Sequence, residues 1–241
     1  VSYSGQCYLS YSIGGHSANR GECAQPCRKK YTLVDDKGNI LAKDRHLLSL
    51  KDFNASEHIE KLANIGVSSF KIEGRLKNEN YIKNVVAYYR QKLDKIGEKT
   101  SSGRVFLDFK PNVAKSFNRG FTDYFLNGRQ KIFNFKTPKS IGERIGKIGH
   151  VGKNYFVIKN NNIHAQDGLY FDGTGCLVNK VEGNKIYPNK MVGIKEGLIV
   201  YRNSDVEFEK LLKNSKTKRQ IAVKINILEN KIEAIDEDNN K

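Results

Sequence analysis

The pattern of the sequence changes at about residue 141, and no other feature constrains the fold as tightly. From there on, short runs of β-prone residues alternate with Gly- and Asn-rich turns about every ten residues. Tight turns join antiparallel neighbours, so the pattern predicts a small antiparallel β-barrel or sandwich over residues 141–203. The predicted strands are Arg144–Ile148, Tyr155–Ile158, Gly168–Phe171, Cys176–Val181, Lys185–Tyr187 and Leu198–Tyr201.

Helix, strand and helix follow one another in the first half of the chain. Asn54 and Glu57 are spaced as a capping box for a helix over residues 54–65. A buried strand is predicted over residues 67–72, and the apolar spacing of residues 78–96 predicts a longer helix. One such α/β unit cannot complete a parallel sheet, which needs several strands and cover on both faces. We therefore expect this region to be completed by segments outside these 241 residues.

Shorter elements surround these two regions. Strands at 31–34 and 40–42 with a Gly- and Asn-containing turn at 35–39 predict a hairpin. A short helix is predicted within residues 113–126 and a charged helix over residues 205–220. The tail that follows is strand-like at first and ends in a run of charged and polar residues. The predicted domain division is 1–97, 98–140 as a linker, 141–203, and 204–241 as a tail that we interpret as the start of a further segment.

Three of the four cysteines lie together on a loop rich in small and polar residues. Cys7, Cys23 and Cys27 are separated by fifteen and three residues. Thiolates bind zinc or iron–sulfur clusters, and both want four ligands, so one ligand is missing. His16, Cys176 or a residue outside this chain are the candidates. The spacing alone leaves zinc and iron–sulfur both open, beside the simpler interpretation of three free thiols.

Cys176 stands apart from this loop, at a turn that enters a predicted strand. We interpret it as a small buried hydrophobic residue rather than a metal ligand. Disulfides are not expected in a protein of the cytosol, where thiols are kept reduced.

Lys71, Glu73 and Arg75 alternate at the end of the predicted strand, so they are expected on one face. A carboxylate between two cations suits the binding of an anionic or polar substrate, with Glu73 as acid or base. A structural salt bridge that closes the strand explains the pattern equally well. The three residues are candidate catalytic residues on this basis.

The charge of the chain points to an anionic partner. A formal net charge of +16 includes local basic clusters at 28–30, 71–77, 90–95 and 216–219. RNA or DNA fits such a surface, because Lys and Arg release counterions from phosphates. A solvated, lysine-rich surface is the simpler alternative. A membrane surface is not favoured, since we find no basic amphipathic helix with a bulky apolar face.

Apolar runs long enough to span a membrane, which takes roughly 20 residues, are absent from the sequence. The opening residues lack the basic start and apolar core of a signal peptide. We therefore expect a cytoplasmic protein, with secretion not excluded. The sequence shows no Gly-rich phosphate loop, zinc-peptidase motif or clear nucleophile motif.

Several motifs resemble, in order, those of the collagenase-like peptidase family of unknown catalytic type. The resemblance covers about residues 1–205. The motifs are Gly5-Gln-Cys7-Tyr-Leu-Ser10, Gly21-Glu-Cys23-Ala-Gln-Pro-Cys27-Arg-Lys-Lys-Tyr31, Leu48-Ser-Leu-Lys-Asp52, Phe70-Lys-Ile-Glu-Gly-Arg75 and Phe117-Asn-Arg-Gly-Phe-Thr122.

The resemblance has implications for both activity and fold. The family includes bacterial proteins that hydroxylate the wobble uridine of tRNA and a relative that acts on large-subunit ribosomal RNA. It implies that residues 1–97 are the last part of a TIM-type barrel in an α/β or α+β protein, followed by a small β-barrel. It favours RNA modification by tRNA 5-hydroxyuridine formation, with tRNA or another RNA as partner. A collagen- or gelatin-degrading peptidase and a module that only binds RNA are the alternatives.

The resemblance also assigns site residues. Cys7, Cys23 and Cys27 match cluster cysteines of an iron–sulfur site, whose fourth cysteine would fall just before Val1. We therefore expect the cluster in the full-length protein and not in this chain alone, where the loop would be metal-free or oxidised, including as a Cys23–Cys27 disulfide. The predicted phosphate contacts are Arg28, Lys29, Lys30 and Arg119.

Overall fold

A computed structural model of the chain describes residues 7–74, 76–97 and 101–240. The chain forms two compact units. The first comprises Val1–Ala55 and Ala114–Val206, and the second comprises Ser56–Val113 and Glu207–Lys241. Each unit is thus built from two separate stretches of sequence. The domain division at residues 97, 140 and 203 stays a prediction.

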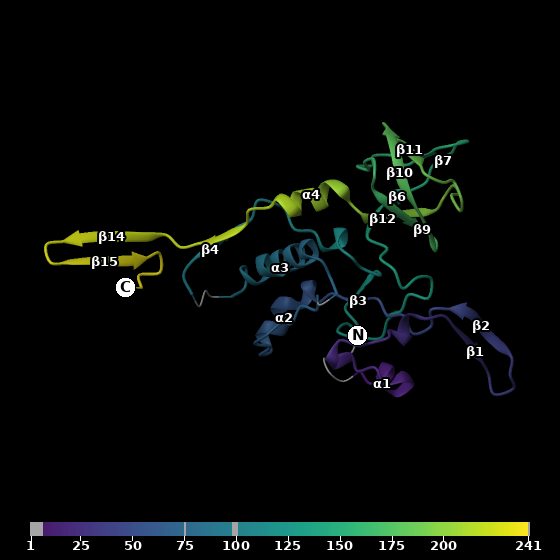
Figure 1. Cartoon of the computed structure of the whole chain (residues 1–241), viewed down its shortest axis with the longest axis horizontal. Coiled ribbons are helices and arrows are strands. Elements are labelled where there is room, and N and C mark those ends of the chain that lie inside the picture. Colours follow the sequence, from purple (N-terminus) through teal and green to yellow (C-terminus); the bar gives the residue numbers. More distant parts are fainter. Residues whose placement is uncertain (1–6, 75, 98–100, 241) are drawn as a thin grey trace. The chain divides into compact units, whose positions relative to one another are not determined.

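A seven-stranded antiparallel sheet dominates the first unit (Figure 1). Its order is β6-β12-β9-β10-β11-β8-β7. Each of the six strands predicted beyond residue 141 is present, and β7 is an addition. The strands are β6 (Glu143–Lys147), β7 (His150–Val151), β8 (Phe156–Val157), β9 (Gly168–Phe171), β10 (Thr174–Glu182), β11 (Lys185–Pro188) and β12 (Ile199–Ser204).

The sheet surrounds an apolar core because buried side chains alternate with exposed ones along its strands. Phe156, Phe171, Ile186 and Val200 have no solvent-exposed surface. The edge strands β6 and β7 follow one another along the chain. Between them, the N–H of Ile148 donates to the carbonyl of Leu198, and the N–H of Gly149 donates to the carbonyl of Val157, both at 2.9 Å. Since no ladder pairs β6 with β7 in the described residues, the closed barrel stays a prediction.

A buried arginine stabilises the end of this sheet. Arg202 is 1% exposed, and its Nη2 lies 2.7 Å from Glu143 and 2.9 Å from Asp205, while Nη1 lies 3.2 Å from Asp167. Burial alone would lower the pKa of Arg202. The hydrogen bonds that Arg202 donates to Glu143 and Asp167 and the negative charge of Asp205 outweigh burial and raise the pKa. Lys115 also pairs with Asp205 at 2.7 Å, which attaches the 114–118 segment to the network.

The N-terminal part of the first unit is less regular. It contains the helix α1 (Leu9–Gly14) and the single turns η1 (Ala18–Arg20) and η2 (Pro26–Arg28). The predicted hairpin is present as β1 (Tyr31–Val34) and β2 (Ile40–Arg45), with the Asp35 carboxylate bound to Asn39 in its turn. A short parallel pair, β3 (Asp52–Phe53) and β5 (Phe121–Thr122), joins this part to residues beyond 114.

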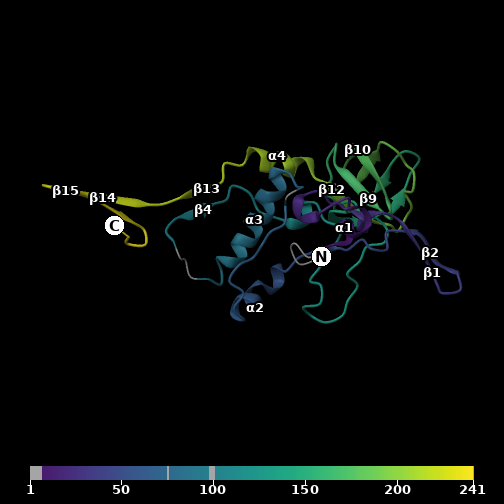
Figure 2. The same cartoon turned by 60° about the horizontal axis from the view of Figure 1, so that its bottom comes forward.

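The second unit is built around the helix α3 (Glu79–Leu93), which begins at Asn78 as N-cap. Figures 1 and 2 both show α3 between α2 (Ile59–Asn64) and α4 (Val206–Asn214). Ala87 packs with Phe109, Phe208 and Leu212 in a small core. The strands of this unit form two pairs, β4 (Arg104–Phe106) with β13 (Lys218–Gln220) and β14 (Val223–Leu228) with β15 (Lys231–Asp236).

Several expected elements differ from the structure. Residues 67–72 form no strand, because no neighbouring strand in the described residues supplies hydrogen-bond partners. The helix expected over 54–65 is only the turn η3 (Ser56–His58) followed by α2, and residues 113–126 hold only the turn η4 (Val113–Lys115). The charged helix ends at Asn214, and the tail folds back as the β14–β15 hairpin.

The part of a TIM-type barrel implied by the resemblance stays a prediction. In the described residues, β3 and β5 form the parallel pair, and the larger sheet is antiparallel. The structure therefore shows a mixed α and β protein. Within the described ranges, no helix is both long and apolar enough to cross a membrane.

Candidate functional site

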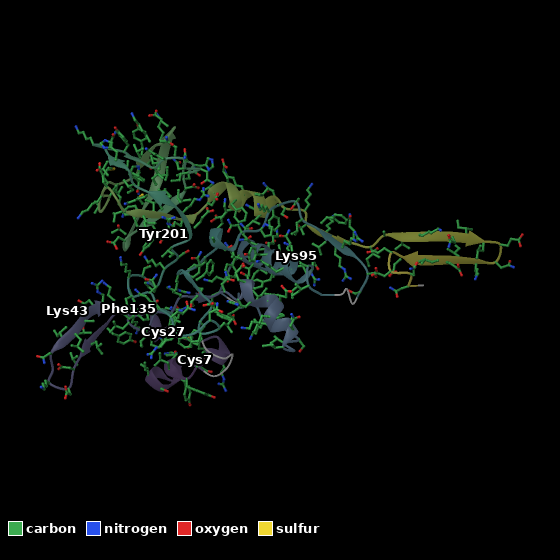
Figure 3. The ribbon with its side chains drawn as sticks, turned by 180° about the vertical axis from the view of Figure 1, so that it is seen from behind. Cys7, Cys27, Lys43, Lys95, Phe135 and Tyr201 are labelled. Atoms are coloured by element: carbon green, nitrogen blue, oxygen red, sulfur yellow. The ribbon has the colours of Figure 1, made fainter. Side chains whose placement is uncertain are left out.

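The cysteine loop is shaped by short helical turns. Helix α1 ends at Gly15, whose φ of 72° lies in the left-handed region that glycine adopts without strain. Gln25 also adopts a positive φ, of 52°, and starts the turn η2 that contains Cys27. Cys7 is exposed, Cys23 and Cys27 are half-buried, and all three are free thiols. Figure 3 labels Cys7 and Cys27. A Cys23–Cys27 disulfide, one of the expected states, is therefore not formed.

Hydrogen bonds fix the inner part of this loop. The N–H of Ala24 donates to Ser10 Oγ at 2.9 Å, and the Tyr31 hydroxyl donates to the carbonyl of Pro26 at 2.7 Å. The N–H of Gln25 donates to Cys23 Sγ at 3.4 Å. Near Cys7, an open hollow of about 140 Å³ is lined by Cys7, Tyr8, Tyr11, Ser17 and Ala18.

Positive charge gathers beside Cys27. Arg28 follows it directly and donates from Nη1 to Ser49 Oγ and to the carbonyl of Leu50, both at 3.1 Å. Arg119 lies just before β5 and is far from the loop in sequence, yet it interacts electrostatically with both Arg28 and Cys27. Cys27 is therefore flanked by two arginines, one adjacent in sequence and one brought close by the fold.

Arg119 is held in place from several sides. Its backbone N–H and its Nη1 both donate to the Asp52 carboxylate, and Nε donates to the carbonyl of Pro138 at 2.7 Å. The guanidinium carbon lies 4.6 Å from the centre of the Phe117 ring. Burial lowers the pKa of Arg119, an effect that the charge of Asp52 opposes and the nearby charge of Arg28 reinforces.

The segment from His46 to Asn54 forms the frame behind the loop. The N–H groups of Asp52 and Asn54 donate to the carbonyls of Gly120 and Thr122, both at 2.9 Å. On another side, the N–H of Lys51 donates to Ile132 at 2.9 Å, and Ser49 accepts from the N–H of Asn134 at 2.8 Å. The frame thus binds together three stretches that lie far apart in sequence.

The fit of this loop to a metal cluster is incomplete. The donor types are suitable, since three thiols lie on one loop and one of them accepts a backbone N–H. However, no three His, Cys, Asp or Glu side chains of the described residues lie close enough together to hold a metal ion. As they stand, Cys7, Cys23 and Cys27 are not gathered into a finished site, so no reaction step is derived through a cluster.

The predicted phosphate contacts fall into two groups. Lys29 and Lys30 are exposed. Arg28 and Arg119 instead direct donors to protein acceptors in the frame. The structure therefore gives these two arginines a positioning role in the loop, and their contact with phosphate stays a prediction.

The predicted catalytic triplet is not brought together on a strand. Lys71 and Glu73 are exposed and belong to the second unit, in the irregular stretch before α3. Because this stretch is not a strand, alternation does not place them on one face. Arg75 lies outside the described residues, as do Val1 and whatever ligand would precede it.

The sequence reasoning did not identify Asp52, Ser49 or His46 as part of this site. His46 Nδ1 lies 2.9 Å from the carbonyl of Arg28, and Asp52 is the carboxylate that holds Arg119. A signal was present, because Asp52 and Arg119 both belong to motifs that carry the family resemblance. The spacing of residues along the chain gives no indication that the motif containing Asp52 contacts the motif containing Arg119.

Comparison with known proteins places the first half of the chain in one family. The model described as "Peptidase family U32" matches residues 1–135, which include the whole cysteine loop and its frame. No solved structure matches the chain at a significant level.

Curated relatives carry two kinds of name. The chain is 39% identical to the 23S rRNA 5-hydroxycytidine C2501 synthase of Escherichia coli, over 94% of this chain and 38% of that protein. It is 31% identical to a collagenase of Porphyromonas gingivalis, over 76% of this chain and 53% of that protein. It is 30% identical to tRNA hydroxylation protein P1 of Bacillus subtilis, over 61% of this chain and 37% of that protein. The chain thus spans roughly two fifths to half of the length of these relatives.

Proposed function

The chain belongs to peptidase family U32, and we propose that the protein containing it hydroxylates a pyrimidine base of RNA. The observation that carries this proposal is the similarity to the 23S rRNA 5-hydroxycytidine C2501 synthase, which extends over 94% of this chain. The net charge of +16 is consistent with an RNA substrate. The protein acts in the cytoplasm, where its RNA substrate is made.

Ribosomal RNA is the favoured substrate. The sequence analysis favoured tRNA, but the identity to the tRNA relative is lower, at 30%, and covers only 61% of this chain. The relative that acts on 23S rRNA is 39% identical over nearly the whole chain. A cytidine in large-subunit RNA is therefore proposed ahead of the wobble uridine of tRNA.

The cysteine loop is proposed to hold an iron–sulfur cluster in the complete protein. Cys7, Cys23 and Cys27 supply three thiolates, with a fourth ligand from outside these three. Arg28 attaches the loop to Ser49 and Leu50, and Arg119 is held near Cys27 by Asp52. A cluster of this kind supplies redox chemistry when bound. The barrel architecture proposed around it is a TIM-type barrel followed by a small β-barrel.

The remaining residues take roles in substrate binding. Lys29 and Lys30, which are exposed beside the loop, are proposed to contact RNA phosphates. Glu73 is proposed as an acid or base at the substrate, together with Lys71 and Arg75.

Nucleoside analysis tests the activity directly. In a strain without the complete protein, digested 23S rRNA should lose 5-hydroxycytidine, and the gene for wild-type protein should restore it. The variant C27S should fail to restore the nucleoside and should lose iron and acid-labile sulfide after purification. C176S is the matched control, because that thiol lies in the sheet core away from the loop, and it should behave as wild type. Unchanged 5-hydroxycytidine and tRNA 5-hydroxyuridine in the deletion strain would refute the proposal.

A peptidase is the second candidate, because the chain is 31% identical to a collagenase. Purified complete protein would then cleave gelatin, and C27S would cleave it equally well. Gelatin cleavage with normal RNA nucleosides in the deletion strain would establish this candidate in place of RNA hydroxylation. RNA binding without RNA hydroxylation or gelatin cleavage would indicate that the protein only binds RNA.

A further inference from the structure

Two tyrosines lie side by side on the outer face of the seven-stranded sheet, away from the cysteine loop in sequence. Ile186 of β11 pairs with Phe156 of β8, and both side chains are fully buried. Side chains alternate along a strand, so the next residues, Tyr187 and Tyr155, point to the outer face. Their ring centres are 5.7 Å apart with an angle of 47° between the rings.

The position of the Tyr155 ring depends on a glycine. A Cβ built at Gly152 would lie 2.5 Å from Cε1 of Tyr155, so the ring occupies space that only glycine leaves open. The N–H of Gly152 also donates to the carbonyl of Tyr155 at 2.8 Å, which closes the turn between β7 and β8. The Tyr155 ring therefore packs against Gly152 in this turn.

Tyr187 is fixed from its hydroxyl end. This hydroxyl donates to Glu182 Oε2 at 2.8 Å, and Glu182 also forms an ion pair with Lys180. Lys180 is opposite Tyr187 in the register of β10 and β11. A rigid pair of aromatic rings loses little conformational entropy when a planar ligand stacks on it.

Lysines cover both rings. Lys185 Nζ lies 4.9 Å from the centre of the Tyr155 ring, and Lys180 Nζ lies 5.9 Å from that of Tyr187. Both lysines are exposed, as is Lys153 in the adjoining turn. Nearby, Glu182 forms an ion pair with Lys180, and Glu196 lies 3.1 Å from His150 Nδ1.

Aromatic rings beside mobile cations form the usual surface for single-stranded nucleic acid, because every base has a flat face that stacks and every nucleotide has a phosphate. A cross-strand tyrosine pair also stabilises a sheet by itself. The lysines over the rings favour ligand binding over a purely structural role. A stacked base would displace the ammonium groups from the rings, and these groups would then lie close to the adjoining phosphates.

We propose that Tyr155 and Tyr187 form a stacking platform for unpaired RNA bases, with Lys180 and Lys185 as phosphate contacts. This platform would hold RNA through the small sheet, separately from the cysteine loop. The inference takes from the proposed function only that the partner is RNA.

Fluorescence anisotropy with a labelled single-stranded oligouridine and the 241-residue chain tests this. The variant Y155L/Y187L keeps apolar packing but removes both stacking faces, and it should bind about 5- to 150-fold more weakly for each base that loses its contact. Y170L/Y201L is the matched control, because these rings form a comparable pair in the same sheet, with centres 6.3 Å apart. It should bind as tightly as wild type, and circular dichroism should show the same folded signal for all variants.

Salt dependence tests the lysines. K180Q/K185Q should reduce the slope of log affinity against log salt by roughly 0.7 for each lost phosphate contact. Equal affinity of wild type and Y155L/Y187L would refute the platform. So would a loss of affinity in Y170L/Y201L as large as that in Y155L/Y187L.

The two proposals fail separately. If Y155L/Y187L binds oligouridine normally while the deletion strain lacks 5-hydroxycytidine, the platform is wrong and the proposed function stands. If the oligouridine arm succeeds and the deletion strain keeps its hydroxylated nucleosides, the platform stands and the proposed function is wrong.

Discussion

The Asp52 carboxylate accepts two hydrogen bonds from Arg119, one from its backbone N–H at 2.7 Å and one from its Nη1 at 2.8 Å. Through this pair, the frame behind the cysteine loop connects to the stretch around β5. The Arg119 side chain is only 14% exposed, so Asp52 supplies the negative charge that compensates its burial. The contact explains why Arg119 interacts electrostatically with Cys27 although the two are distant in sequence.

Asp52→Asn should destabilise the first unit by about 1–3 kcal/mol, because a half-buried guanidinium loses its charged acceptor. Urea denaturation at neutral pH measures this. Asp172→Asn is the matched control, since the Lys136–Asp172 pair is 61% and 54% exposed and should contribute less than about 1 kcal/mol. Equal losses for the two variants would contradict a supporting role for Asp52.

Arg202→Met should cost about 3–5 kcal/mol, because Glu143, Asp167 and Asp205 would remain near one another without their common cation. Thermal denaturation followed by circular dichroism measures the loss. The control is Arg144→Met on the neighbouring strand β6, where the side chain is exposed and the change should stay within about 0.5 kcal/mol. A stable Arg202→Met protein would mean that the network is dispensable.

Gly142→Ala should destabilise the sheet by at least about 2 kcal/mol. A Cβ there would lie 1.9 Å from the carbonyl oxygen of Arg202, and the φ of 78° is strained for alanine. Gly173→Ala separates the two effects, because its φ is 91° and a Cβ would contact nothing within 4 Å. That control should lose only about 1–2 kcal/mol. Chemical denaturation of both variants decides whether the steric contact adds to the backbone strain.

Cys176 should resist alkylation in the folded chain. Burial in the sheet core raises the pKa of this thiol to about 11, from an ordinary value of 9.0. Iodoacetamide at neutral pH should therefore modify the exposed Cys7 and leave Cys176 unmodified until urea unfolds the sheet, as peptide mass spectrometry would show. Rapid native labelling of Cys176 would contradict its burial.

The same raised pKa gives a pH dependence of stability. Between pH 9 and about 11 the folded chain keeps the Cys176 proton that the unfolded chain releases, so this stabilisation is complete below pH 9 and is lost as the pH rises to about 11. Urea midpoints measured across this window should fall for wild type by more than for C176S. Parallel curves for the two proteins would show that the thiol titrates normally.

Local sequence was a good guide where structure depends on near neighbours. The strands beyond residue 141 were predicted from β-prone runs between turns, the hairpin at Asp35–Asn39 from its turn residues, and the helix that begins after Asn78 from its apolar spacing. The strand at 67–72 was wrong, because an apolar run becomes a strand only when another strand pairs with it. The β14–β15 hairpin was half missed, because the second strand is rich in charged residues.

The sequence by itself determined the sheet-forming half, the loop that carries three cysteines and, through its motifs, the membership of peptidase family U32. These depend on residue type and short-range spacing. Only the tertiary structure decided that Asp52 holds Arg119 beside Cys27, that Arg202 is buried among three carboxylates, and that Tyr155 and Tyr187 meet on one face. Each is a contact between residues that are distant in sequence. Strand register and the path of the chain fix such contacts, and local propensity contains no information about them.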